Sequence, residues 1–490
     1  MRHECGVLIV LGLVMAGVAW AAPGDTLWTK TCGGIGQDKA ASVCCAADGG
    51  FAIAGTTTSF GAGGADFWLV RTDAAGETLW TRTYGGPGED ECHDMVATGD
   101  GGFALAGHTT SFGTVGWFDA YLVKVDSLGQ VEWDEHYHSS QLIRYTYALI
   151  QTADGGYVIC GCEDSVQGII SRLVFMAKVN AAGTLVWMES YRPGSSLLAT
   201  GLDVIRTSDN GFAAGGTALM ASYDACLVKA DSSGNESWIN WFGGPSSNDQ
   251  CLGLLQTPDH GYLLAGLTTL SGQGGQDACV LKISPSGNSV EWMRTFGGPN
   301  DDVAADPCPA AAGGYFIVGT TGSFGAGGDD LYAVRTDDSG DTLWTAAYGG
   351  PLADSGVSAA QTADGGFVIA GWTESWGAGS SDFYLVKIAG DPLAPMALRM
   401  HLLHPTTARL SWLPVVGATE YEIYRSATAF FTTVGTPWAT VPAPATQLDV
   451  TEGVGDPAVD YSYRGRSRNA TSVSVESETV GERDFVVPCP

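Results

Sequence analysis

Carboxylates and aromatic rings recur together along this sequence, in loops that we expect on one face of the fold. The candidate ligand-binding residues are Asp90, Asp249, Asp301, Asp302, Asp354, Phe60, Phe112, Trp117, Phe324 and Trp376. Carboxylate oxygens suit hard cations, and aromatic rings offer an apolar surface that can cover the face of a sugar. We therefore expect a carbohydrate or Ca²⁺ as the ligand and predict no other cofactor. The alternative is that the acidic residues are solvated turn formers.

Catalytic residues are harder to identify. A hydrolase or lyase needs paired carboxylates, or a nucleophile with its base, but acid pairs carry little information in a chain with 53 acidic and 23 basic residues. The eight histidines are scattered, and we interpret His93 as a solvated loop residue. Cys44-Cys45 and Cys160-Gly161-Cys162 have no second pair at zinc-ligand spacing. We therefore assign no catalytic residue and no metal ligand.

The net charge of −30 limits the partners of the chain. Binding to nucleic acid or to an anionic membrane depends on Lys and Arg side chains that neutralise phosphate. We therefore expect neither nucleic acid as a partner nor insertion into a membrane.

The first 21 residues resemble a secretory signal. An apolar run of 15 residues, Gly6 to Trp20, follows Arg2, and small residues surround a cleavage site after Ala21. The run is shorter than the ~20 residues that span a bilayer. We therefore expect a secreted or cell-surface protein, extracellular or periplasmic. Removal of the signal, which holds Cys5, leaves eleven of the 12 cysteines, and most fall at strand positions where we expect buried free thiols.

A repeat must position these loops. One tryptophan recurs every 51–54 residues, and the repeated residues are Trp28, Trp80, Trp133, Trp187, Trp238, Trp292 and Trp344. Each unit has four short alternating runs, with a hairpin turn such as Asp100-Gly101-Gly102. An Asp precedes the third run in six of the seven units, and we interpret it as a turn cap. The tryptophan is expected to dock one sheet on the next and to donate its N–H to a backbone carbonyl.

Seven units of four antiparallel strands predict an all-β fold, a seven-bladed β-propeller over residues 22–391. The first unit begins with an outer strand that has no preceding partner, and the last unit stops at residues 382–388 without one. We therefore predict that residues 24–31 supply the outermost strand of the last blade and close the ring.

Residues 392–488 follow a linker and lack the repeat. Their strand-like runs resemble a fibronectin type III domain, in which Trp412 would be the buried Trp of the second strand and Tyr461 the tyrosine corner. Both residues are structural in that family, so this resemblance implies a β-sandwich and no activity.

The repeated unit, with DGGF and SFGAGG followed by a TLWT strand, resembles the seven-bladed propeller repeats of exported, multidomain bacterial surface proteins. That resemblance implies a non-enzymatic binding or scaffold role, with polysaccharide or another surface protein as partner. The Trp strand is also similar to the docking motif of pyrroloquinoline quinone dehydrogenases. The alternatives are therefore an exported polysaccharide-active hydrolase or lyase, or a quinone-dependent dehydrogenase.

Overall fold

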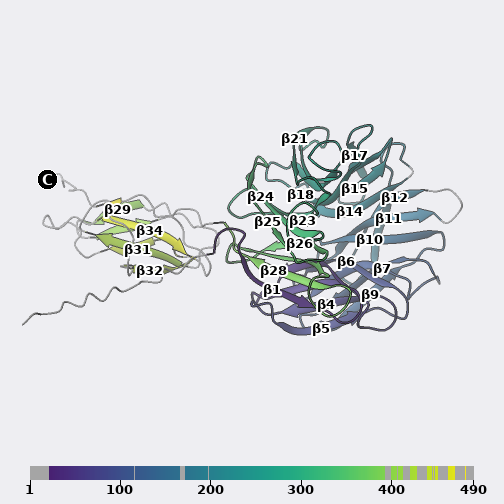
Figure 1. The fold of residues 1–490 in the computed structure, drawn as a ribbon, viewed down its shortest axis with the longest axis horizontal. Coiled ribbons are helices and arrows are strands. Elements are labelled where there is room, and N and C mark those ends of the chain that lie inside the picture. Colours follow the sequence, from purple (N-terminus) through teal and green to yellow (C-terminus); the bar gives the residue numbers. More distant parts are fainter. Residues whose placement is uncertain are drawn as a thin grey trace, which may run out of the picture.

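In the residues that it describes, the computed structural model has 35 β-strands, and Figure 1 shows their arrangement. It describes residues 21–114, 116–165, 171–196 and 198–391, and in the C-terminal region the segments 399–404, 407–411, 420–426, 437, 439–443, 445, 447–450, 462–468 and 480–481. The predicted signal, residues 1–20, lies outside the described residues. Strands β1 to β28 form seven four-stranded antiparallel sheets, which is a seven-bladed β-propeller.

Each blade runs from an innermost to an outermost strand in sequence order, except the last. Blades 1 to 3 are β2 (Asp38–Cys45), β3 (Phe51–Thr57), β4 (Asp66–Thr72), β5 (Thr78–Tyr84); β6 (Asp90–Ala97), β7 (Phe103–Thr109), β8 (Asp119–Val125), β9 (Val131–Tyr137); and β10 (Leu142–Gln151), β11 (Tyr157–Ser165), β12 (Arg172–Val179), β13 (Leu185–Tyr191). Blades 4 and 5 are β14 (Ala199–Arg206), β15 (Phe212–Leu219), β16 (Tyr223–Ala230), β17 (Glu236–Phe242); and β18 (Asp249–Gln256), β19 (Tyr262–Thr268), β20 (Asp277–Ile283), β21 (Val290–Phe296). Blades 6 and 7 are β22 (Asp302–Pro309), β23 (Tyr315–Thr321), β24 (Asp330–Thr336), β25 (Thr342–Tyr348); and β26 (Asp354–Gln361), β27 (Phe367–Thr373), β28 (Asp382–Ile388), β1 (Thr26–Cys32).

The ring closes as the sequence predicts. Strand β1 pairs antiparallel with β28, with Trp28 opposite Lys387 and Cys32 opposite Phe383 (Figure 1). The first strands of neighbouring blades contact each other around the axis, including β26 with β2. The outermost strand of the last blade therefore comes from the other end of the propeller sequence.

A repeated contact joins each blade to the next. The indole of each outermost strand covers a turn glycine of the following blade, where a side-chain carbon would collide with the ring. The pairs are Trp28–Gly76, Trp80–Gly129, Trp133–Gly183, Trp187–Gly234, Trp238–Gly287, Trp292–Gly340 and Trp344–Gly24. These glycines have φ between +73° and +85°, a region that favours glycine. The seventh pair crosses the closure, so residues before β1 serve as the turn of the last blade.

A tyrosine hydrogen bond accompanies this contact in four blades. The hydroxyl that ends the outermost strand donates to the carbonyl of the same glycine, as from Tyr84 to Gly129 (3.0 Å) and from Tyr348 to Gly24 (2.5 Å). The expected indole N–H bond to a carbonyl is found for Trp133, which donates to Ala181, whereas Trp187 Nε1 is buried without a partner. Ring packing is thus the repeated part of the docking, and the N–H bond is not.

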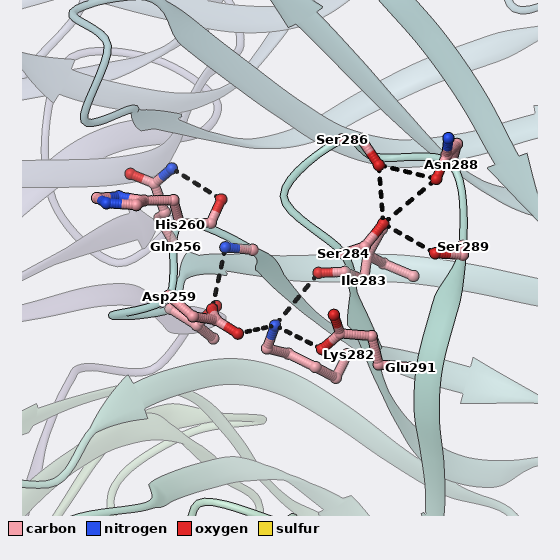
Figure 2. Close-up of polar contacts among 12 residues, drawn as sticks. Gln256, Asp259, His260, Lys282, Ile283, Ser284, Ser286, Asn288, Ser289 and Glu291 are labelled. Atoms are coloured by element: carbon pink, nitrogen blue, oxygen red, sulfur yellow. Dashed lines mark hydrogen bonds and ion pairs between the residues drawn. The ribbon is translucent and has the colours of Figure 1, made fainter.

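The two faces of the ring differ. We call the face with the loops between second and third strands, and between one blade and the next, the wide-loop face. The opposite face is the tight-turn face, and there each third strand ends in a basic residue beside the hairpin turn. Figure 2 shows Lys282 Nζ donating to Asp259 (2.9 Å), Glu291 (3.1 Å) and the carbonyl of Ile283 (3.3 Å). The equivalent pairs are Asp48–Arg71, Asp100–Lys124, Asp154–Lys178, Asp209–Lys229 and Asp364–Lys387.

Blade 6 has no acidic residue in its hairpin turn, and its basic residue takes another partner. Arg335, which is 1% exposed, binds Asp391 at 2.6 Å, and Trp344 Nε1 donates to the same carboxylate at 3.1 Å. Asp391 is the last residue described before the C-terminal region. The ion pair of this blade therefore fixes the point where the chain leaves the propeller.

The described C-terminal strands form two small sheets. One contains β29 (Arg399–His404), β30 (Thr407–Ser411) and β33 (Gln447–Val450), and the other contains β31 (Glu420–Ser426), β32 (Ala439–Pro442), β34 (Ser462–Arg468) and β35 (Val480–Gly481). Trp412 and Tyr461 lie outside the described residues. The fibronectin type III sandwich therefore stays a prediction.

The cysteines of the propeller are free thiols, either buried or half-buried. Burial raises the pKa of Cys44, Cys162 and Cys226 to about 12, so these thiols are protonated and unreactive. Cys5 and Cys489 lie outside the described residues.

We predict that adding a methyl group at a glycine that packs under a Trp ring lowers the free energy of unfolding by more than the strain of a positive φ alone would. Gly129→Ala places a carbon 2.7 Å from the Trp80 ring at a positive φ, and we expect it to lower the free energy of unfolding by about 2–4 kcal/mol. Gly101→Ala is the matched control, because φ there is +88° and no atom lies within 4 Å. We expect Gly101→Ala to lower the free energy of unfolding by only about 1–2 kcal/mol. If urea unfolding shows the same decrease in the free energy of unfolding for both variants, the packing of Trp80 on Gly129 does not contribute to docking.

Candidate functional site

The ten candidate residues lie on the wide-loop face, distributed around the ring rather than gathered at one point. Four of the aspartates begin innermost strands and are at most 5% exposed: Asp90, Asp249, Asp302 and Asp354. The fifth, Asp301, is exposed in the loop between β21 and β22 and accepts a hydrogen bond from the N–H of Gln276 (2.9 Å).

The buried aspartates hold the loops of their own blade together. Asp90 accepts hydrogen bonds from Thr109, from the hydroxyl of Ser111 (2.6 Å) and from the N–H of Gly86 (2.7 Å). The same arrangement is found around Asp302, with Thr321, Ser323 and Gly298. These carboxylates have internal donors, and a ligand-binding role for them stays a prediction.

Four of the aspartates at the start of third strands cap the preceding loop, as the sequence predicts: Asp66, Asp277, Asp330 and Asp382. Asp66 accepts the N–H of Ala62 at 2.9 Å, and Asp382 accepts the N–H of Ala378 at 2.7 Å. Burial raises the pKa of Asp382, and the neighbouring Asp38 raises it further. Each of these residues fixes the glycine-rich loop that precedes its own strand.

The candidate aromatic residues are more accessible than the aspartates. Phe60, Phe324 and Trp376 are each 45% exposed, whereas Phe112 and Trp117 are half-buried. The ring of Trp376 lies 5.5 Å from that of Tyr384, so its own blade holds it while one side stays open. Phe60 and Phe324 lie in the same way on Trp68 and Tyr332. The face thus carries fixed aromatic rings around its rim.

A β-bulge in every innermost strand shapes the axis of the ring. The register shifts by one residue at the same place in all seven blades. The extra residues are Ala41, His93, Tyr147, Leu202, Leu252, Ala305 and Val357, and all of them line a central cavity of about 160 Å³. A bulge re-aims a side chain that regular pairing would direct elsewhere. These seven side chains therefore determine what can enter the axis.

A larger cavity of about 670 Å³ opens above the bulges on the wide-loop side. Most of its lining residues come from the first two blades and the seventh. Lys39 and Trp372 line one wall, with the Lys39 nitrogen 4.3 Å from the centre of the indole ring. Glu91, His93 and Tyr147 line another. Two charged groups, one imidazole and two aromatic rings therefore face one space that could hold a small polar ligand.

His93 is the clearest departure from the sequence interpretation. It is not a solvated loop residue but the bulge of β6, and its ring stacks on His108 with centroids 4.8 Å apart. Glu91 lies directly opposite His108 in the pairing of β6 with β7. The carboxylate oxygen Glu91 Oε2 is 3.8 Å from His93 Nε2 and 3.6 Å from His108 Nε2. Within the described part of the chain, these residues form the single group of three potential metal ligands within 4.8 Å of one another.

The surroundings shift the pKa of two members of this group, His93 and Glu91. Burial, followed by the nearby His108, lowers the pKa of His93 to about 3, so its ring is neutral at physiological pH. The neighbouring imidazole of His108 lowers the pKa of Glu91, which is therefore ionised.

Three more carboxylates face the axis, from alternate blades. Asp94, Asp203 and Asp306 each follow a bulge, whereas the equivalent residues of the other blades are Ser42, Ala148, Gly253 and Ser358. Each accepts an N–H from the next blade: Asp94 from Leu149 (2.8 Å), Asp203 from Leu254 (2.6 Å) and Asp306 from Ala359 (3.0 Å). Burial raises the pKa of all three, to about 7 for Asp94. They tie neighbouring blades together at the axis.

Aligning the seven units marks His93 and the three axial aspartates as departures from the repeat, although it does not show where they lie. His93 occupies the column that holds an aliphatic residue in five units, and the aspartates occupy every second unit of the next column. The bulge itself has no signature in one sequence, and without it His93 and Asp94 cannot be assigned to the axis.

Comparisons with known proteins assign no family to the chain. No protein-family model matches the chain, and no curated protein matches it. Among solved structures, a protein of unknown function from Dyadobacter fermentans is 11% identical, with a TM-score of 0.41, over 74% of this chain and 99% of that one. BBS1N in complex with ARL6DN is 10% identical, with a TM-score of 0.43, over 75% and 97%. Sqt1 from Chaetomium thermophilum is 10% identical, with a TM-score of 0.41, over 94% and 100%.

Within the segments that the structure describes, no helix has the length and apolar character needed to cross a bilayer.

From the pKa shifts of the carboxylates we predict that the free energy of unfolding is greatest near pH 4. The pKa of Asp94 is raised from 3.8 to about 7, so the folded state binds more protons and the free energy of unfolding falls as pH rises from about 4 to 7. Burial raises the pKa of Asp209 and Asp259, but hydrogen bonds from Thr and Lys side chains lower it to about 2 overall. Their contribution is present above pH 4 and is lost as pH falls towards 2.

Urea unfolding at pH 3, 4, 5 and 7 measures this profile. Asp94→Asn should flatten the decline between pH 4 and 7, because one of the titrating groups is gone. Glu236→Gln is the control, since it changes an exposed carboxylate at the start of β17. A wild-type stability that rises steadily from pH 4 to 7 would contradict the protonation of the axial carboxylates.

Proposed function

We propose that the protein is an exported, non-enzymatic binding or scaffold protein that takes a polysaccharide on the wide-loop face of the propeller. The observation that carries the proposal is the set of half-exposed aromatic rings on this face, each fixed by its own blade. A sugar ring can lie on such a surface without first ordering it, which removes part of the entropic cost of binding.

The large cavity supports the same face as the binding surface. Its wall combines the ionic groups of Lys39 and Glu91 with the rings of Trp372 and Tyr147. Small-molecule sites commonly combine apolar walls with a few polar groups that fix orientation. One sugar residue of a chain lying across the rim could enter this space while its neighbours contact Phe60 or Trp376.

The excess of acidic residues agrees with a neutral or cationic polysaccharide. With a net charge of −30, the chain would repel a polyanionic glycan at low salt. The export part of the proposal rests on the signal sequence of residues 1–21.

A glycan array with the purified chain tests the proposal, followed by titration of the best glycan. We expect Trp376→Ala to weaken binding by about tenfold or more, because the loss of one aromatic contact costs on the order of 1–2 kcal/mol. Leu128→Ala is the control, since Leu128 is 62% exposed in a turn of the tight-turn face. No bound glycan, or equal affinities for both variants, would contradict the proposal.

The same experiment separates the alternatives. A binding protein leaves the glycan intact, so we expect no new reducing or unsaturated ends after prolonged incubation. Released ends would indicate the hydrolase or lyase alternative. Capture of a surface protein in place of a glycan would indicate a scaffold with a protein partner.

A further inference from the structure

We propose that Glu91, His93 and His108 bind one divalent transition-metal ion, of the Zn²⁺ or Co²⁺ type, at the wall of the large cavity. The observations for this site do not depend on the polysaccharide proposal, although Glu91 and the cavity are common to both. Two imidazole nitrogens and one carboxylate form a donor set that these ions favour, and a set of three protein ligands leaves a position open for water or a ligand.

Two of the three distances within the group, those from Glu91 to each histidine, fit an ion better than direct hydrogen bonds. Glu91 Oε2 lies 3.8 Å from His93 Nε2 and 3.6 Å from His108 Nε2, and both distances exceed the 2.7–3.2 Å of a good N–H···O bond. Ligands about 2.0–2.1 Å from a tetrahedral ion lie about 3.4 Å apart. The two oxygen–nitrogen distances are therefore within about 0.4 Å of those expected around one ion.

Unpaired nitrogen atoms provide a second, separate observation. His93 Nε2, which faces Glu91, is buried without a hydrogen-bond partner, and so is Nδ1 of His108. A buried nitrogen without a partner costs free energy, and an ion beside Glu91 would remove that cost for His93. His108, which is 4% exposed, is held among the rings of Phe118 and Tyr145 and cannot turn away from the site.

The strand geometry supplies two of the ligands at fixed positions. Glu91 and His108 are cross-strand partners in β6 and β7, so their side chains leave the same face of the sheet. His93 lies two residues after Glu91, but the bulge places it at the axis. Its ring, stacked on His108 at 26°, must turn so that both nitrogens point to one ion. The side chain of His93 is 29% exposed and borders the cavity, so it has space to turn.

The surroundings also limit the affinity. Metal-binding histidines usually donate the second ring nitrogen to a carbonyl or carboxylate, but His108 Nδ1 has no such partner. We therefore expect micromolar rather than nanomolar binding of Zn²⁺. Ca²⁺ prefers six to eight oxygen ligands and should not compete.

Calorimetry with Zn²⁺ and absorption spectroscopy with Co²⁺, on the full chain freed of metal by chelation, test the site. We expect one ion per chain, with a visible Co²⁺ spectrum that Zn²⁺ abolishes and Ca²⁺ does not. Glu91→Gln and His93→Ala should each weaken Zn²⁺ binding by about 100-fold. His260→Ala is the control, because His260 is exposed on the tight-turn face and should leave binding unchanged.

Thermal unfolding shows whether each variant is folded. Zn²⁺ should raise the Tm of the wild-type chain and of His260→Ala, but not that of Glu91→Gln, since an ion that binds only the folded state stabilises it. Absence of Zn²⁺ binding below millimolar concentration would overturn the proposal. Unchanged affinity in folded Glu91→Gln and His93→Ala would also overturn it, because the ion would then lie elsewhere.

Discussion

The packing of one indole ring on one glycine, repeated at all seven blade boundaries, is the contact on which the rest of this structure depends. A flat sheet can bury both faces only if its neighbours lie at a fixed angle, and the Trp–Gly contact fixes that angle at the outer edge. The axial carboxylates Asp94, Asp203 and Asp306 join three of these seven pairs of blades at the inner edge. Rim and axis together leave each blade little freedom to move against the next.

Much of this architecture follows from the sequence because the repeat is periodic. The Trp positions give the number of blades, and the unpaired first strand of the sequence gives the closure. Three features could not be predicted in this way, because each depends on spatial partners distant in sequence. The bulge at His93, the pairing of Lys282 with a turn aspartate, and the contact of Asp391 with Arg335 and Trp344 all appear only once the sheets are placed.

In the candidate site, too, some features can be predicted from the sequence and others depend on contacts in space. The position of the aromatic residues in loops of one face can be predicted from the sequence, because such loops are visible one unit at a time. The burial of Asp90 and its equivalents cannot be predicted, since an acidic loop motif looks the same whether it is buried or exposed. The neighbours of His93 cannot be predicted either, because the one-residue register shift that brings them together leaves no trace in the composition of β6.

The wide-loop face and the central cavity exist only if β1 closes the ring. Native-state hydrogen exchange of the β28 amides tests this most directly, because an open chain would leave β28 as an edge strand. In the closed propeller, amides along Asp382–Ile388 should exchange as slowly as those of β24, because β28 is paired with β1 on one edge and β27 on the other. Fast exchange at alternate residues of β28 would show that β1 is not bound there and would contradict the closed propeller.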